Sequence, residues 1–422
     1  MLEILQSFIL FVINFPSEFL NWLGNLSAMD LLAITWFAIV IDISRNVFKA
    51  IVLGADAIYR HFRPVIVNKS YQPKISVLIP AHNEAPAIRK TIASILENPY
   101  PNKEIIVIDD HSTDNTYDQA YLYHEKGLIK LVRRTEGKGS KAAAINYGAV
   151  FATGDYIMVM DGDTLVERNA LREIAKCLSA PNIAAASGNV RILAGDGGVK
   201  NILTELQAYE YLLAFELGRR YNSILSMLLI VPGAFGVFPN TLAKKVGLYD
   251  RDTLGEDFDL TIKLLKTKGK IGFASKAVAW TYCPNNWKAW LRQRIRWSHG
   301  QIATLMKHND VTRVYTYRRQ FVVAIYDMIF ADIGLLFLRM AGLIWLAFVF
   351  PSQLYFIYTL IILLYFVNEA IAIATAAFVS SEKTTLKYIY LMPIVILFYR
   401  PFHTHVRLYA YLKHLFKLES KW

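Results

Sequence analysis

The stretch KISVLIP, residues 74–80, is an apolar run that predicts a buried β-strand. A polar turn and a helix at about 85–97 follow it, and KEIIVID, residues 103–109, predicts a second strand. The alternation continues, with strands expected at 128–133 and 155–160 and helices expected at about 114–125 and 140–152. Strands that alternate with helices through short connections form a mostly parallel sheet covered on both faces. The sequence therefore predicts an α/β domain with ligands at the carboxyl ends of its strands.

Acidic side chains follow two of these strands at the edge where a ligand is expected. Asp109 and Asp110 end the second strand, and Asp161-Gly162-Asp163 follows the fourth. The first strand is followed by Ala81-His82-Asn83-Glu84, whereas a dinucleotide-binding fold shows G-x-G-x-x-G there. A P-loop is also missing, because Gly137-Lys138 is followed by glycine and not by Ser or Thr. We therefore expect a site that binds a cation and a nucleotide through carboxylates.

Two acidic motifs offer metal-binding and proton-transfer chemistry. Asp161 and Asp163 place two carboxylates near one point, and hard oxygen ligands suit Mg²⁺ or Mn²⁺. A pair of acids that caps a loop is the alternative. Gly255-Glu256-Asp257 opens a helix predicted at 257–268, where Asp257 is either an N-terminal cap or a general base that removes a proton from a hydroxyl.

A third motif, Gln293-Arg294-Ile295-Arg296-Trp297, lies on a predicted helix just before the C-terminal apolar block. Its glutamine and two arginines can hold a diphosphate, and the tryptophan face can stack on a sugar. Tryptophan and arginine also mark the borders of membranes, so an interfacial anchor helix is the alternative.

Composition indicates a membrane protein with a substantial water-facing part. The 422 residues carry a formal net charge of +12, and 54% are hydrophobic. Only 19% are charged, which is below the roughly 25% of a soluble domain. The two cysteines, Cys177 and Cys283, exclude a disulfide scaffold and a cysteine-rich zinc site. Nucleic acid is not an expected partner, because no recognition motif appears and the basic residues gather beside the apolar segments.

The apolar runs lie at the two ends of the chain. We expect N-terminal membrane helices within residues 1–60, a catalytic domain at 72–285 and interfacial helices at 286–332. C-terminal membrane helices are expected at 333–402, as runs at 333–350, 354–380 and 386–402, followed by a basic amphipathic tail at 403–422. Basic residues at the borders of the middle part predict that it is cytoplasmic, in a plasma membrane. A cytoplasmic tail needs an even number of C-terminal spans, which conflicts with three unless 321–332 supplies a fourth.

Together these motifs resemble those of the membrane-bound, inverting family 2 glycosyltransferases of the GT-A fold. Relatives in that family make cellulose, chitin, hyaluronan and poly-N-acetylglucosamine. The matching segments occur in the family's order and are 80–84, 109–114, Lys141 with Asn146, 161–163, 255–257 and 293–297. Gly255 stands where the family usually has threonine, and His82 where tyrosine is common.

The resemblance implies a metal-dependent glycosyltransferase with a UDP-sugar donor and a role for each matching residue. The expected donor-binding residues are Pro80, Asn83, Glu84, Asp109, Asp110, Lys141 and Asp161. Asp163, with Asp161, is expected to bind Mg²⁺ or Mn²⁺, and Asp257, with Glu256, to act as the catalytic base. The diphosphate and acceptor are assigned to Gln293, Arg294, Arg296 and Trp297.

The sugar and the acceptor are less specified. Residues 188–192 (GNVRI) resemble a segment of the poly-N-acetylglucosamine and hyaluronan synthases, which favours an N-acetylhexosamine; a plain strand is the alternative. A processive polysaccharide synthase, a single-transfer enzyme with a lipid acceptor and a non-catalytic scaffold all remain open. Asp332, Arg339 and Glu369 lie in apolar stretches, where they either line a product path or pair with one another. Few membrane segments suggest a narrow channel or an accessory membrane subunit.

Overall fold

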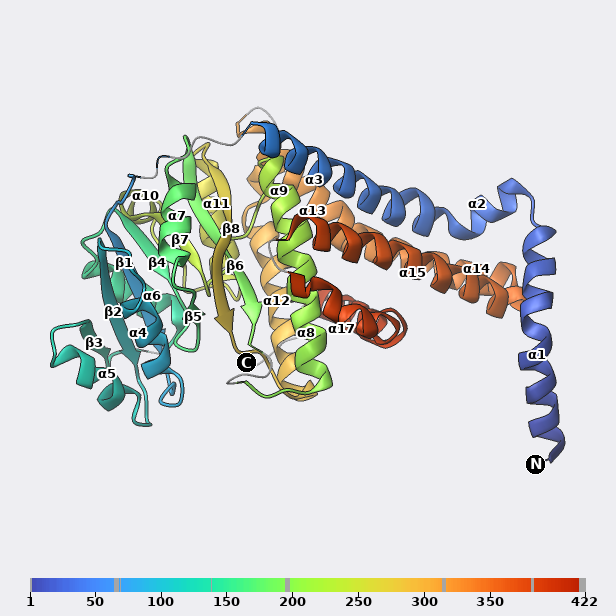
Figure 1. Cartoon of the computed structure of the whole chain (residues 1–422), viewed down its shortest axis with the longest axis horizontal. Coiled ribbons are helices and arrows are strands. Elements are labelled where there is room, and N and C mark those ends of the chain that lie inside the picture. Colours follow the sequence, from blue (N-terminus) through green and yellow to red (C-terminus); the bar gives the residue numbers. More distant parts are fainter. Residues whose placement is uncertain are drawn as a thin grey trace.

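The computed structural model describes residues 2–63, 68, 70–137, 139–193, 198–312, 316–380 and 383–416. It consists of an α/β domain and a group of long helices that extends from one side of it (Figure 1). Two helices of the chain's middle part, α8 and α12, lie between the sheet and the long helices (Figure 1). The fold therefore has three zones, namely a sheet, an intermediate helical layer and an apolar helical group.

One eight-stranded sheet organises the α/β domain, in the order β3-β2-β1-β4-β7-β6-β8-β5. Its strands are β1 (Ile75–Ala81), β2 (Lys103–Asp110), β3 (Lys130–Arg134), β4 (Tyr156–Val159), β5 (Leu165–Val166), β6 (Ile183–Ile192), β7 (Gly236–Pro239) and β8 (Lys270–Thr281). The four strands predicted from sequence are β1 to β4, and they pair in parallel. β7 then pairs antiparallel with β4 and β6, and β5 antiparallel with β8. The predicted α/β sheet is confirmed for its first half, and the second half is mixed.

Helices cover both faces of this sheet. They are α4 (Ile88–Leu96), α5 (Thr116–His124), α6 (Lys141–Val150), α7 (Ala170–Leu178), α10 (Asn240–Lys245) and α11 (Glu256–Lys266). Successive β1 residues point to opposite faces, so Val77 and Ile79 pack with α4 and α7 while Leu78 packs with α6 and α11. Burial on both faces explains the continuous apolar run of β1.

The intermediate layer joins the sheet to the long helices. It contains α8 (Ile202–Leu213), the π-helix η2 (Ala214–Arg219), α9 (Arg220–Ile224), α12 (Trp287–Lys307), the 3₁₀ turn η3 (Asn309–Thr312) and α17 (Arg400–Leu415). Trp290 of α12 is fully buried, and its indole N–H donates to the Tyr399 hydroxyl at 3.0 Å. The same apolar cluster includes Leu53 and Ile373 from the long helices. Packing therefore fixes the α/β domain against the apolar group.

Three of the long helical stretches have the length and composition needed to cross a membrane, namely Ala28–Phe62, Arg319–Val349 and Pro351–Val379. The first contains α2 (Ala28–Trp36), η1 (Phe37–Ile43) and α3 (Ser44–Phe62); the second contains α13 (Arg319–Met328), η4 (Ile329–Gly334) and α14 (Leu335–Val349). The third contains η5 (Pro351–Gln353) and α15 (Leu354–Val379). The first helix, α1 (Leu2–Gly24), lies across their far ends (Figure 1).

The C-terminal segments differ from the prediction of three apolar runs. Residues 321–332 belong to the long stretch Arg319–Val349, and residues 386–402 are not a candidate span of the described chain. That region is divided into η6 (Lys383–Leu391), α16 (Met392–Ile394), η7 (Val395–Tyr399) and the start of α17. Pro393 lacks an N–H and disfavours an uninterrupted helix through it. Part of the predicted tail, residues 417–422, lies outside the described residues.

Candidate active site

The carboxyl end of β2 is held by arginines of β3. Asp109 is fully buried and pairs with Arg133, with 3.1 Å between Oδ2 and Nε. Asp110 pairs with Arg134 at 2.9 Å, and its Oδ2 accepts the backbone N–H of Ser140 at 3.0 Å. Ser140 caps α6, so Asp110 ties the end of β2 to the start of that helix. Both predicted donor-binding carboxylates therefore carry their own countercharges.

The turn after β1 is built around Asn83, which adopts a left-handed φ of 58°. Asparagine tolerates this conformation better than most residues. Its side-chain carbonyl accepts the Thr113 N–H at 2.8 Å, and its own N–H donates to Ser112 Oγ at 3.1 Å. The next N–H, of Glu84, donates to Thr116 Oγ1 at 2.7 Å. These bonds join the loop after Pro80 to the loop after β2.

A cluster of carboxylates lies where β1 and β4 end. Lys141, the first residue of α6, forms an ion pair with Asp161. Burial and the neighbouring Asp161 raise the pKa of Asp163 to about 6. Burial and both aspartates raise the pKa of Glu84 to about 7. A Cβ on Gly162 would lie 3.0 Å from Glu84 Cγ, so glycine allows the close approach. One lysine balances only part of this negative charge.

Gly233 brings the start of α11 to the same cluster. Its N–H lies 3.4 Å from Asp257 Oδ2, and a Cβ on it would be 2.9 Å from Lys141 Nζ and 4.0 Å from Asp257 Cβ. The other oxygen of Asp257 accepts the Phe258 N–H at 2.8 Å. Lys141 and Asp257 therefore face one another across a residue without a side chain.

Two arginines border Asp257 and its neighbour. Burial and Asp257 raise the pKa of Glu256, while the positive charge of Arg296 acts in the opposite direction. Burial lowers the pKa of Arg219 to about 10, and the charge of Asp257 acts against that decrease. Arg219 is fixed by donating to the Ile230 carbonyl at 2.6 Å. Sequence reasoning missed Arg219 and Gly233, because neither lies in a chemically distinctive motif.

The residues of α12 divide between the site and the intermediate layer. Arg294 is buried, pairs with Glu210 at 2.9 Å and lies over the Trp297 ring, 4.4 Å from its centroid. Its guanidinium is therefore held within the protein, and Glu210 is a partner that the sequence did not reveal. Arg296 and Trp297 are exposed. Gln293 Oε1 is buried and has no hydrogen-bond donor within the described part of the chain.

Backbone contact places α12 beside the start of α11. A Cβ on Gly300 would lie 2.8 Å from the Gly255 nitrogen, and one on Gly255 would lie 3.1 Å from the Gly300 backbone. Only residues without side chains permit this approach. The contact explains why the charge of Arg296 is felt at Glu256 although the two lie on different helices.

The carboxylates of the cluster include two that suit a divalent cation. Among the described residues, no three His, Cys, Asp or Glu side chains form a metal-binding group. Asp161 and Asp163 nevertheless supply hard oxygens, and burial and the neighbouring Asp161 raise the pKa of Asp163, an effect that a bound cation would oppose. Mg²⁺ commonly takes one or two carboxylates and completes its shell with phosphates and water. The two aspartates fit an ion of that kind.

The structure thus brings six predicted residues together around one space, namely Glu84, Lys141, Asp161, Asp163, Glu256 and Asp257. Arg296 lies within electrostatic range of them. Arg294 does not join this cluster, because its guanidinium forms an ion pair with Glu210.

Comparisons with known proteins concern the family and the fold of the chain. Residues 76–238 match the family model described as Glycosyl transferase family 2. A poly-beta-1,6-N-acetyl-D-glucosamine synthase of Staphylococcus epidermidis is 30% identical over 271 residues, covering 62% of this chain and 65% of that protein. A Bacillus subtilis protein named "Probable glycosyltransferase YdaM" is 33% identical over 247 residues, covering 57% of this chain and 58% of its own length. The chain thus spans somewhat less than two thirds of these curated relatives.

Among solved structures, the mannosyltransferase PcManGT from Pyrobaculum calidifontis, in complex with GDP-Man and Mn²⁺, superposes with a TM-score of 0.58. The match covers 92% of this chain and 100% of that chain at 22% sequence identity. This similarity confirms the predicted GT-A fold.

Proposed function

We propose, from the premise that residues 76–238 are a Glycosyl transferase family 2 domain, that this protein is a membrane-bound glycosyltransferase. It transfers a sugar, N-acetylglucosamine or another hexose, from a UDP-sugar to an acceptor hydroxyl with inversion, as a processive polysaccharide synthase. The observation that carries the proposal is the meeting of Lys141, Asp161 and Asp257 around Gly233. This arrangement places the Lys141 ammonium beside Asp257, the proposed base, so that a sugar donor and an acceptor can bind next to each other.

In the proposed reaction Asp257 is the general base. The acceptor oxygen bonds to the anomeric carbon from the face opposite UDP, the bond from that carbon to the diphosphate breaks, and the hydroxyl proton passes to the Asp257 carboxylate. Lys141 and Arg296 place positive charge where the diphosphate leaves. Asp161 and Asp163 hold a divalent cation, which, when bound, stabilises the charge of the leaving diphosphate. Holding both reactants together supplies the orientation.

The donor sugar and repeated transfer are supported by the relatives. Several matched proteins are named poly-beta-1,6-N-acetyl-D-glucosamine synthase, which favours UDP-N-acetylglucosamine. The segment 188–192 gives little separate support, because its polar side chains have structural partners. Asn189 and Arg191 donate to Glu216 Oε1 at 3.0 and 3.1 Å, which anchors η2 to β6.

We place the protein in the plasma membrane as a multi-pass protein with a cytoplasmic α/β domain. The candidate spans are one before that domain and two after it, so the described end of the chain and the domain lie on the same side. This removes the conflict that three C-terminal spans created. Basic residues at the domain borders favour the cytoplasmic side. The bilayer and an accessory membrane subunit are the further partners that we expect.

The test uses the full chain in nanodiscs with Mn²⁺ or Mg²⁺ and a panel of UDP-sugars. UDP release is recorded, and the product is sized by mass spectrometry. We expect UDP release with UDP-N-acetylglucosamine and a long polymer. Asp257→Asn should reduce turnover by about 10²–10⁴-fold because the base is lost. Asp252→Asn, at an exposed aspartate just before the same helix, is the matched control and should stay active.

A product one sugar heavier than a lipid would replace the processive proposal with single transfer. Normal turnover of Asp257→Asn would show that another group removes the proton. Release with none of the donors, by a protein that binds none of them, would contradict the enzymatic proposal.

A further inference from the structure

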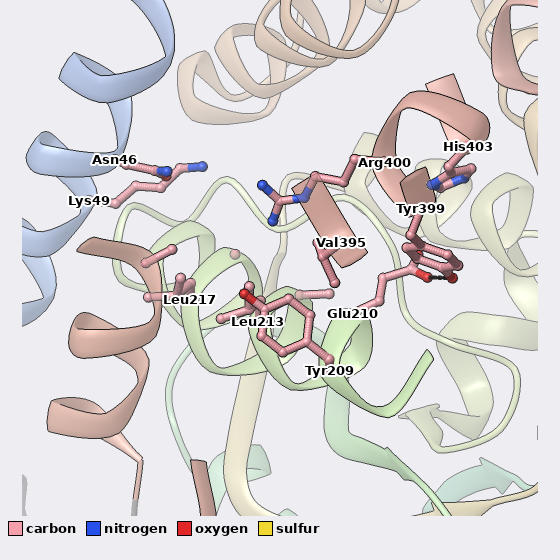
Figure 2. A pocket seen from close by; sticks show the side chains of 13 residues that line it. Asn46, Lys49, Tyr209, Glu210, Leu213, Leu217, Val395, Tyr399, Arg400 and His403 are labelled. Atoms are coloured by element: carbon pink, nitrogen blue, oxygen red, sulfur yellow. Dashed lines mark hydrogen bonds between the residues drawn. The ribbon is translucent and has the colours of Figure 1, made fainter. Parts of the chain in front are cut away.

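A cavity of about 310 Å³ lies apart from the carboxylate cluster, between the intermediate layer and the long helices. Figure 2 shows Arg400 reaching into it from α17 and Lys49 facing it from α3. Asn46, Tyr209, Glu210 and His403 complete its polar lining. Side chains from four distant segments therefore converge on one space at the boundary of the candidate membrane spans.

Two carboxylates lie at this cavity, Glu210 in its lining and Glu369 behind Arg400, and both are already paired. Glu369 is fully buried and pairs with Arg400, whose Nη2 lies 2.8 Å from its Oε1. Glu210 pairs with Arg294 and also accepts the Tyr399 hydroxyl at 2.6 Å. Neither acid is free to neutralise a further cation.

Lys49 takes part in neither of these two ion pairs. No carboxylate of the described chain lies within ion-pair distance of its ammonium group, although it belongs to the candidate span Ala28–Phe62. Burial lowers the pKa of His403 to about 4, so its ring is neutral at pH 7 and adds no charge. Among the residues that line the cavity, the charge of Lys49 is therefore left in excess.

An uncompensated ammonium in an apolar setting is costly, and such residues usually face a polar partner. Phosphate suits this arrangement, because the Lys49 ammonium binds its oxygens as a point charge and Arg400 can donate from the guanidinium N–H groups that do not face Glu369. Part of the lining is apolar, with Leu213, Leu217, Ala372 and Val395 beside the cations. A free phosphate would leave that surface exposed, whereas a hydrocarbon chain would cover it.

We propose that this cavity binds the phosphate group of a membrane lipid, with Lys49 and Arg400 on the phosphate and the apolar lining on the hydrocarbon part. The site needs no sugar donor. Its occupancy is therefore measured separately from glycosyl transfer, and its failure would leave the proposed transferase activity untouched.

The experiment titrates delipidated full-length protein in detergent with dioctanoyl phosphatidic acid, using isothermal titration calorimetry. Dioctanoylglycerol, which lacks the phosphate, and inorganic phosphate, which lacks the chains, are the comparison ligands. We expect the phosphatidic acid to bind at least about tenfold more tightly than either, as the loss of a charge-assisted contact predicts. Equal binding of dioctanoylglycerol would overturn the phosphate assignment, and equal binding of inorganic phosphate would overturn the lipid assignment.

Two variants test the lysine. Lys49→Met removes the charge with a side chain that suits a membrane helix and should weaken phosphatidic acid binding at least about tenfold. Lys49→Arg keeps the charge and should restore binding. Arg60→Gln, at an exposed position of the same helix, is the matched control and should bind as the wild type does. Wild-type affinity of a folded Lys49→Met protein would overturn the proposal.

Discussion

The first turn of helix α11 carries three acidic side chains, Glu256, Asp257 and Asp259, in two opposite electrostatic settings. At its N-terminus, burial and mutual repulsion raise the pKa of Glu256 beside Asp257. Asp259, in the same turn, is fully buried. Burial alone would raise the pKa of Asp259, yet a hydrogen bond with His308 and an ion pair with Lys307 lower it to about 2.

The difference lies in the number of cations supplied to each acid. Asp259 lies 3.0 Å from both Lys307 Nζ and His308 Nε2, and 3.5 Å from Lys263 Nζ. In the part of the chain that the structure describes, the carboxylate cluster around Asp163 has one ion pair, between Lys141 and Asp161. The acids on one side of this helix are neutralised by cations of the protein itself, and the acids on the other side are not, as the proposed binding of an external cation requires. Departures from the usual pairing of buried charges are expected at functional sites.

Removing the paired acid should have the largest effect on stability. Asp259→Ala leaves Lys307 and His308 without their buried partner and should reduce the free energy of unfolding by about 3–5 kcal/mol. Thermal unfolding in detergent measures this, with Asp252→Ala, at an exposed partner of the same lysine, as the control. The folded pKa lies below the unfolded value, so this stabilisation is present above a pH of about 4 and is lost as the pH falls towards 2. If Asp259→Ala and Asp252→Ala lost the same free energy of unfolding, Asp259 would not be the strongly paired acid that we describe.

Neutralising Asp163, which has no ion-pair partner among the described residues, should increase the free energy of unfolding. The folded Asp163 carboxyl keeps its proton up to a pH of about 6, so the wild type loses stability as the pH rises from about 4 to about 6. Asp163→Asn avoids that loss and should raise the free energy of unfolding by about 2–3 kcal/mol at pH 7.5 in EDTA. The gain should vanish at pH 4, where both side chains are neutral. A destabilised variant at pH 7.5 would show that Asp163 is paired after all.

The smallest expected effect is the pH dependence of metal binding. Protons compete with the cation for Asp163, so the Mn²⁺ concentration for half-maximal thermal stabilisation should rise up to about tenfold per pH unit below a pH of about 6. Asp163→Asn should show weak stabilisation by Mn²⁺ at every pH. If this Mn²⁺ concentration did not change with pH in the wild type, the cation would be bound by Asp161 without Asp163.

Sequence predicted the half of the fold whose pattern is local. Strands β1 to β4 follow one another with helices between them, and their order could be read from hydrophobic periodicity. The second half pairs β6 with β8 and β7 with β4 across long insertions, and nothing in the apolar runs specifies that exchange. The predicted third C-terminal run failed for a similar reason, since hydropathy does not register how Pro393 interrupts a helix.

The candidate site was predictable where a motif names the chemistry. Asp161, Asp163 and Asp257 stand at strand ends or a helix start that the sequence pattern located. Arg294 looked equivalent to Arg296, and only packing shows that one faces Glu210 while the other is exposed. Gly233 carries no chemistry of its own, so its role between Lys141 and Asp257 emerged only from three-dimensional proximity.

The contact between Gly255 and Gly300 also has a consequence for the order of synthesis. A nascent chain that ends before Trp287 already contains every strand of the sheet and all the clustered carboxylates. It lacks the helix whose backbone closes over the start of α11, and that helix is itself held by α17, near the end of the chain. We therefore expect the proposed site to be completed only after the two candidate C-terminal spans have been synthesised, so that an unfinished chain would not yet bind a sugar donor.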